Sequence, residues 1–226
     1  MACLDILKVK QTTRKKYKEK NNSYGYRCAE FDTYNWSDSI LFLGCSHVYG
    51  MANTVENSIP YLCSKLLNKV SINMGISGGG PGTVLHNTYA LIEKCYIPEC
   101  VVILWPECTR HLYYMGHKMA SGERVLLLGS WSDDQKRKLW EPHVECAENY
   151  MTKAYLMQSA VNKAWQFAGT RVLNFNFKAK GDVARETVPI VYPFPFFPEP
   201  VDKARDGIHL GPETNLNYAK FITKYY

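Results

Sequence analysis

The sequence predicts an α/β protein built as a three-layer α/β/α sandwich, with a central, mostly parallel sheet between two layers of helices. Two observations support this fold class. Short apolar runs rich in β-branched residues alternate along the 226-residue chain with longer segments whose apolar residues recur at helical spacing. Strands that alternate with helices pair in parallel, and the connecting helices then cover both faces of the sheet.

Four apolar runs are predicted to be buried strands because they are short and bounded by turn residues: residues 39–43, 69–73, 100–105 and 171–175. Apolar residues at helical spacing predict helices at residues 59–67, 84–95 and 145–167, and a last helix that begins after Gly211 and Pro212. The predicted strands and helices therefore alternate over most of the chain.

Two stretches interrupt this alternation. Residues 111–144 combine many charges with several aromatic residues, and we expect an irregular insertion there. Residues 192–200 hold four prolines, and they cannot form a helix or a central strand because proline lacks an amide donor. Phe194 and Phe196 in this stretch are predicted to line one wall of a substrate pocket. A loop that only covers the core is an equal alternative.

The positive charge is concentrated at the amino end. Residues 1–20 hold seven of the 27 Lys and Arg residues and two of the 21 Asp and Glu residues. The remainder is nearly neutral, which argues against a polyanion-binding domain. We expect a basic extension over residues 1–36, in which the basic run at residues 8–20 is a solvated arm, and one domain over residues 37–226.

The cysteines and the apolar runs restrict the class of protein further. Eight cysteines without a CxxC pair predict neither a disulfide scaffold nor a zinc site. The amino end has no apolar stretch of signal-peptide length, and no run approaches the ~18 residues of a membrane span. We therefore expect a soluble, cytoplasmic protein, with incorporation into a larger assembly or virion left open.

The first candidate site residue is Ser46, which lies in the segment Gly-Cys-Ser-His-Val-Tyr-Gly at residues 44–50, directly after the first predicted strand. Open α/β folds place their sites at the carboxyl ends of the strands. A serine between glycines also arises easily by chance. Taken alone, the motif is better explained as an ordinary turn from a strand to a helix.

Asp206 and His209 form the second candidate motif. Three residues apart, the two side chains can meet within one turn, so that the carboxylate holds one imidazole nitrogen while the other accepts a proton from a serine. The motif precedes the last predicted helix, where a loop returns to the carboxyl edge of the sheet. The chain thus holds a nucleophile, an orienting carboxylate and a base, in the order Ser, Asp, His.

A glycine-rich block at residues 73–82 follows the second predicted strand. Glycine permits close backbone approach, so an amide in this block can point at a developing negative charge. A phosphate-binding loop is the competing interpretation. It is disfavoured because no Lys-Ser or Lys-Thr follows the glycines.

With these three motifs, the chain resembles the SGNH or GDSL-like hydrolases over about residues 39–226. The segment Gly-Cys-Ser at residues 44–46 resembles the first block of the family, residues 73–78 resemble its glycine block, and residues 206–209 resemble its last block, Asp-x-x-His. The resemblance implies an SGNH or flavodoxin-like fold. It also implies an esterase, lipase, thioesterase or carbohydrate deacetylase that needs no metal or organic cofactor.

Carried over residue by residue, the resemblance assigns a role to each site residue. Ser46 is the nucleophile, His209 the general base and acid, and Asp206 its orienting partner. The backbone amides of Ser46 and Gly78 are the oxyanion donors. His47 and Trp105 are expected to line the substrate pocket.

The chain departs from the family pattern at two places. Cys45 stands where the family has aspartate, which affects the turn more than the chemistry.

The third block also lacks its asparagine, a third oxyanion donor, because residues 105–110 read Trp-Pro-Glu-Cys-Thr-Arg. Loss of one such donor typically costs ~10²- to 10³-fold in rate. Thr109 and Arg110 are the candidate substitutes, and a salt bridge to a neighbouring acid is the favoured alternative for Arg110. The segment Gly-Cys-Ser-His-Val-Tyr-Gly at residues 44–50, together with Pro106 and Arg110 after the third predicted strand, resembles a divergent branch met in phage and bacterial proteins.

Three function hypotheses follow. The first is a serine ester hydrolase that acts on a small ester or an acetylated carbohydrate. The second is an SGNH-like binding or structural module with little or no activity, for instance a virion or surface assembly component, which the missing asparagine and the basic arm favour. Nucleic-acid binding through residues 8–20 ranks last.

Overall fold

The computed structural model describes residues 5–8, 21–114, 125–176 and 194–226. Most of the basic run predicted as a solvated arm, residues 9–20, lies outside these ranges, as do residues 192 and 193 of the proline-rich stretch. Within the described ranges, four parallel strands form a sheet in the order β2-β1-β3-β6. The strands are β1 (Ser39–Gly44), β2 (Val70–Gly75), β3 (Cys100–Trp105) and β6 (Arg171–Asn176). They lie where the sequence predicts them, to within two residues at each end.

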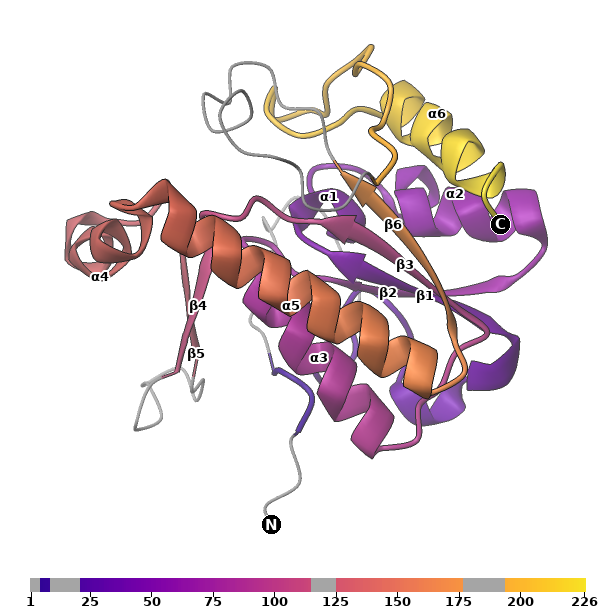
Figure 1. The fold of residues 1–226 in the computed structure, drawn as a ribbon. Coiled ribbons are helices and arrows are strands. Elements are labelled where there is room, and N and C mark those ends of the chain that lie inside the picture. The colour runs from indigo at the N-terminus through magenta and orange to yellow at the C-terminus, as the bar shows by residue number, and fades with distance from the viewer. Residues whose placement is uncertain (1–4, 9–20, 115–124, 177–193) are drawn as a thin grey trace.

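Two pairs of helices cover the two faces of this sheet (Figure 1). The contacting helices α2 (Ile59–Leu67) and α6 (Pro212–Thr223) lie on one face, and α3 (Pro81–Glu93) and α5 (Ala147–Phe167) pack together on the other. The predicted three-layer α/β/α fold class is therefore confirmed.

The central strand β1 is buried on both faces. Leu41 and Leu43 belong to the apolar cluster beneath α3 and α5, whereas Ile40 and Phe42 belong to the cluster beneath α2 and α6. Successive side chains of a strand point to opposite faces of the sheet, so an uninterrupted apolar run contributes to two cores at once. This explains why the strands read as continuous apolar runs.

The segment expected as an N-terminal extension contributes to the same domain. Ile6, Tyr26, Phe31 and Trp36 are buried in the cluster beneath α3 and α5. Two short 3₁₀ turns, Phe31–Thr33 and Trp36–Asp38, lead from this segment into β1. The described part of residues 1–36 is therefore packed against the core.

The predicted irregular insertion contains regular elements. Strand β4 (His111–Tyr114) pairs antiparallel with β5 (Val125–Leu128), and α4 (Asp134–Val144) follows. Helix α4 begins at a capping residue, because the Asp133 carboxylate accepts the Lys136 amide hydrogen at 3.0 Å. No residue of α4 is buried, so its sequence carries no apolar stripe from which a helix could be predicted.

The proline-rich stretch lies at the outer edge of the sheet beside β6. Phe196 forms an isolated parallel bridge with Asn176. The next residue, Phe197, is buried and stacks on Tyr218 of α6, with ring centroids 4.2 Å apart. Over its described residues, 194–200, the stretch thus forms neither a helix nor a central strand, as the prolines predict.

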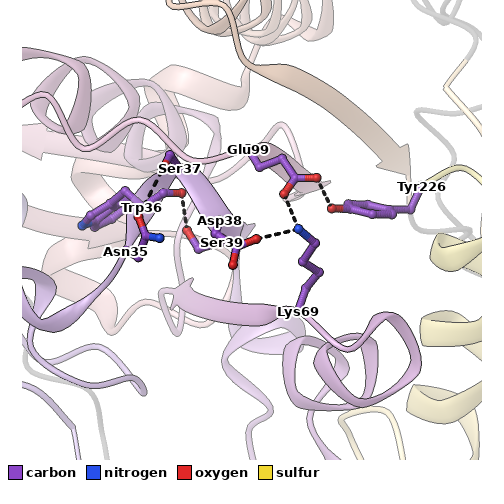
Figure 2. Close-up of polar contacts among 8 residues, drawn as sticks. All are labelled: Asn35, Trp36, Ser37, Asp38, Ser39, Lys69, Glu99 and Tyr226. Atoms are coloured by element: carbon purple, nitrogen blue, oxygen red, sulfur yellow. Dashed lines mark hydrogen bonds and ion pairs between the residues drawn. The ribbon is translucent and has the colours of Figure 1, made fainter.

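A polar network ties together the amino ends of β1, β2 and β3 (Figure 2). Lys69 Nζ lies 2.6 Å from Asp38 Oδ1 and 2.7 Å from Glu99 Oε2. The Tyr226 hydroxyl donates to Glu99 Oε1 at 2.5 Å. These contacts join the residues that precede β1, β2 and β3 to the last residue of the chain.

Candidate active site

Ser46 occupies a sharp turn at the carboxyl end of β1. The strand ends at Gly44, and the short helix α1 (Ser46–Tyr49) begins at Ser46, which is 6% exposed. A Cβ placed on Gly44 would lie 2.6 Å from both the Leu104 carbonyl oxygen and a Val48 methyl group. A larger residue therefore does not fit at position 44, and the turn places Ser46 at the carboxyl edge of the sheet.

The glycine block holds α1 against β2. The Asn73 side-chain amide donates to the Val48 carbonyl at 3.0 Å, and its oxygen accepts the Gly75 amide hydrogen at 3.0 Å. A Cβ on Gly75 would lie 2.2 Å from the Tyr49 nitrogen. Asn73 and Gly75 therefore fix the helix that carries Ser46, a role separate from the oxyanion role that the resemblance implies for Gly78.

Arg27 is a positioning residue that the sequence analysis did not identify. Its guanidinium donates to the carbonyls of Gly50 at 2.8 Å, Asn53 at 2.9 Å and Tyr49 at 3.2 Å. These carbonyls lie at the carboxyl end of α1 and just beyond it, and Arg27 is 6% exposed. A buried guanidinium thus donates to carbonyls at the end of a four-residue helix, one of which, that of Gly50, also accepts the Asn53 amide hydrogen at 3.1 Å.

Asp206 and His209 meet in a tight loop, as their spacing predicts. Asp206 Oδ2 lies 2.7 Å from His209 Nδ1, and Oδ1 accepts the amide hydrogens of Ile208 and His209, each at 3.0 Å. Gly207, with φ of +72°, allows the turn between them. A carboxylate only accepts hydrogen bonds, so the Nδ1 facing it carries a proton and Nε2 is the basic atom of a neutral His209.

The environment of Asp206 keeps its side chain ionised. Burial acts to raise its pKa, but hydrogen bonds from the His209 amide, the His209 imidazole and the Ile208 amide prevail and lower the pKa to about 2. The carboxylate is 7% exposed. It therefore remains a fixed negative charge beside His209 at any physiological pH.

This low pKa predicts acid sensitivity. A carboxylate whose folded-state pKa is depressed stabilises the fold above its unfolded-state pKa, and that contribution is lost as the pH falls from about 4 to about 2. The free energy of unfolding, measured in urea at several pH values, is expected to fall more steeply over this range in the wild type than in Asp206→Asn. Parallel curves for the two proteins would contradict the assignment.

The loop of Asp206 and His209 lies beside the segment that follows β1. The His47 and His209 rings meet edge to face, with centroids 5.6 Å apart and an interplanar angle of 64°. The Asn53 side-chain amide donates to the Leu210 carbonyl at 2.9 Å. The structure therefore brings the two motifs together through His47 next to Ser46 and through Asn53, a second positioning residue that sequence reasoning missed.

His47 is a neutral group in this arrangement. Burial first, and then electrostatic interactions with His209 and Arg110, lower the pKa of His47 to about 3, although Asp206 acts in the opposite direction. An imidazole with this pKa carries no charge near neutral pH. It can line the site but does not serve as its acid or base.

The two residues suggested in place of the missing asparagine both contact Glu107. The Thr109 hydroxyl donates to Glu107 Oε1 at 2.8 Å, and Arg110 Nε lies 3.4 Å from Glu107 Oε2. The salt bridge that was the favoured alternative for Arg110 is thus present. The Arg110 guanidinium also stacks over the Trp131 ring, 4.9 Å from its centroid. An oxyanion role for either residue stays a prediction.

Trp131 covers the glycine that the resemblance assigns to the oxyanion hole. Gly78 has φ of +76°, and a Cβ placed on it would lie 3.1 Å from Trp131 Cζ2. The Trp131 side chain is nevertheless 49% exposed. Local sequence patterns do not predict this contact, because Trp131 comes from the insertion and is more than fifty residues away from Gly78.

The remaining predicted pocket residues lie in different surroundings. Trp105 is 3% exposed in the core, where its indole donates to Asn174 Oδ1 at 2.8 Å. Phe194 is half-buried against the same apolar cluster, whereas Phe196 is 37% exposed. A substrate-lining role for these three residues stays a prediction.

Two further properties concern metals and membranes. Among the residues that the structure describes, no group of three or more His, Cys, Asp or Glu side chains is arranged to hold a metal ion. Within the same ranges, every helix is too short or too polar to cross a bilayer.

No protein-family model and no curated protein matches the chain. Among solved structures, the chain is similar to a G-D-S-L family protein from Desulfitobacterium hafniense DCB-2, with 12% identity and a TM-score of 0.38 over 84% of this chain and 100% of that one. It is also similar to the acetyl xylan esterase Est2A from the rumen bacterium Butyrivibrio proteoclasticus, with 12% identity and a TM-score of 0.40. That match covers 85% of this chain and 64% of the esterase, so the chain spans less than two thirds of it.

Proposed function

We propose that the protein is a serine ester hydrolase that works by acyl transfer through Ser46, His209 and Asp206. The observation that carries the proposal is the Asp206–His209 pair. One carboxylate oxygen holds Nδ1 of the imidazole at 2.7 Å while the other is fixed by two backbone amides. A histidine held in this way has a defined tautomer, and its Nε2 is free to take up a proton in catalysis.

In the proposed reaction, His209 Nε2 accepts the Ser46 hydroxyl proton as the oxygen attacks the acyl carbon. The tetrahedral oxyanion collapses when His209 returns that proton to the leaving alcohol, which breaks the ester bond and leaves an acyl group on Ser46. Water then repeats the sequence on the acyl-enzyme and releases the carboxylic acid. Asp206 stays ionised throughout and stabilises the imidazolium that forms.

The oxyanion is assigned to the backbone amides of Ser46 and Gly78. Ser46 lies at the first residue of α1, where amide groups have no partner within the helix. Gly78 follows β2, the neighbour of β1, so both amides belong to the carboxyl edge of the sheet. Arg110 is the third candidate donor, although its pairing with Glu107 makes it the weakest of the three.

An O-acetylated carbohydrate is the proposed substrate class, because a rigid aromatic surface lies beside the proposed oxyanion hole. The Trp131 ring lies beside Gly78 and beneath the Arg110 guanidinium, and about half of its surface is exposed. Indole rings present a large flat surface at a low cost in side-chain entropy. Such a surface suits the apolar face of a sugar ring.

Replacing Trp131 should therefore affect the hydrolysis of a sugar ester more than that of an ester without a sugar. In Trp131→Ala, we expect KM for an O-acetylated oligosaccharide to rise about tenfold, since an aromatic contact is worth ~1 kcal/mol or more. The value of kcat/KM for p-nitrophenyl acetate, which has no sugar, should change by no more than about twofold. Trp131→Phe should restore most of the oligosaccharide affinity. Equal KM values in all three proteins would contradict this substrate class.

The proposed activity itself is tested by hydrolysis of p-nitrophenyl acetate with the wild type, Ser46→Ala and His209→Ala. The wild type should hydrolyse the ester and both variants should not. The same rate in all three proteins would refute the triad and favour an SGNH-like module without catalytic activity.

A further inference from the structure

A cavity of about 280 Å³ lies among α3, β4, α5 and the end of α4. Apolar side chains form much of its wall, including Leu85 of α3, Leu112 of β4, and Ala154 and Met157 of α5. Ser46, Asp206 and His209 do not line it. The triad residues are therefore not part of this cavity, although Thr109 and Arg110, the two candidates for the third oxyanion donor, line it.

The lining includes a cluster of basic groups, which we call the basic cluster: His111, His143 and Lys153. The two imidazole rings stack with centroids 3.9 Å apart and planes 19° from parallel. The ammonium of Lys153 is close enough to both rings to lower their pKa values. Three groups that are or can become cations therefore line the same cavity.

Acidic groups are missing from the described lining of this cavity. The other titratable or charged side chains that face it are His86 and Tyr89 from α3, Cys108 and Arg110 from the segment before β4, Tyr114 from β4 and Tyr150 from α5. Of these, Arg110 pairs with Glu107, and His86 is held by the Tyr114 hydroxyl at 2.5 Å and the Asp5 carbonyl at 2.8 Å. The basic cluster therefore faces no carboxylate inside the cavity.

We propose that this cavity binds a small organic carboxylate, with the carboxylate at the basic cluster and the apolar body against Leu85, Leu112 and Met157. The proposal goes beyond the ester hydrolysis described above and does not depend on it. A carboxylate supplies the negative charge that the described lining lacks, and Lys153 can donate to it directly. The cavity volume equals that of about nine water molecules, which suits a ligand as large as benzoate.

The His111–His143 pair should make the affinity for a carboxylate depend on pH. Burial, the neighbouring His143 and Lys153 together lower the pKa of His111 to about 4, and burial and Lys153 also lower the pKa of His143. Both rings are therefore neutral at pH 7 in the empty cavity. A bound anion favours the protonated rings and raises their pKa values, so benzoate should bind more tightly as the pH falls from 7.5 to 5.5.

The test is calorimetric titration of the full-length protein with benzoate, with benzamide as the neutral control of the same shape. We expect benzoate to bind at least about tenfold more tightly than benzamide, and Lys153→Met to weaken benzoate binding about tenfold. Lys163→Met is the matched control, because Lys163 is exposed on the same helix and does not line the cavity. Its affinity for benzoate should equal that of the wild type.

Two further variants locate the binding. Met157→Trp fills the cavity and should abolish binding, with circular dichroism and the thermal midpoint used to check that it folds. Ser46→Ala should bind benzoate like the wild type, so a failure of the proposed ester hydrolysis leaves this test unaffected. The proposal is overturned if benzoate does not bind, if benzamide binds equally well, if Lys153→Met and Lys163→Met behave alike, or if a folded Met157→Trp retains full affinity.

Discussion

Ser46→Ala and His209→Ala are each expected to lower kcat for p-nitrophenyl acetate by about 10⁴- to 10⁶-fold. The first variant removes the oxygen that forms the acyl-enzyme. The second removes the group that accepts and returns the proton, and at neutral pH an unassisted serine hydroxyl is a poor nucleophile. The residual rate should come from the oxyanion donors and from binding alone. Because the two residues act as one unit, the double variant should be about as slow as either single variant.

Two control variants keep this result specific. Ser37→Ala removes an exposed serine hydroxyl near the amino end of β1 (Figure 2), and His143→Ala removes an imidazole from the separate cavity. Both should retain the wild-type rate. Thermal midpoints of all variants should be compared first, so that loss of activity is not mistaken for loss of fold. Folded Ser46→Ala and His209→Ala proteins that keep wild-type rates would contradict the proposed mechanism.

Arg27→Met is expected to lower the free energy of unfolding by about 3 kcal/mol, the largest single effect on stability that we anticipate. Methionine retains the apolar length of the side chain but leaves the carbonyls of Tyr49, Gly50 and Asn53 without the guanidinium donors. The Gly50 carbonyl keeps its hydrogen bond from the Asn53 amide, but the loss of each buried hydrogen bond from Arg27 is costly. The lost hydrogen bonds hold the end of α1, the helix that begins at Ser46. The activity of the folded fraction should therefore also decrease.

Urea denaturation followed by tryptophan fluorescence measures this change. Arg137→Met is the matched control, because Arg137 is exposed on α4 and its loss should change stability by less than about 0.5 kcal/mol. The slope of the free energy with urea should be the same in all three proteins if only stability changes. A free energy of unfolding for Arg27→Met within error of the control would show that Arg27 is not required to hold α1.

The sheet was predictable because its strands are buried on both faces. Val101, Val102 and Ile103 of β3 form an uninterrupted apolar run, and the two faces of that run supply two separate apolar clusters. Helices α2 and α6 were predictable for a related reason. Each has an apolar stripe, and each begins with a proline near its first position, which marks the start of a helix.

Other parts of the fold left no local signal in the sequence. Helix α4 buries none of its side chains, and the short strands β4 and β5 are joined by residues outside the described ranges. The packing of Tyr26 and Phe31 into the core depends on residues of β1 and α3 that are distant in the sequence. Contacts of this kind are set by the tertiary structure, which periodicity along the chain does not report.

Some contacts of the candidate site were likewise predictable from the sequence and others were not. The Asp206–His209 contact was predictable because three residues bring the two side chains within reach. Contacts made by Arg27, Asn53 and Trp131 were not, because each side chain reaches a segment more than twenty residues away and no motif names its partner. The asparagine missing from residues 105–110 drew attention to Arg110, and a salt bridge to a neighbouring acid was the favoured prediction for it, which the contact between Glu107 and Arg110 confirms.

Covalent trapping of Ser46 tests the central claim most directly. The wild-type protein is treated with a fluorophosphonate, which bonds to a serine oxygen activated by a neighbouring base, and the digested product is mapped by mass spectrometry. The proposed mechanism predicts one phosphonyl adduct, on the peptide that contains Ser46. That adduct should be absent in Ser46→Ala and form far more slowly in His209→Ala. A wild-type protein without an adduct, or with its adduct on Cys45 or on a serine elsewhere, would contradict the claim that Ser46 is a nucleophile activated by His209.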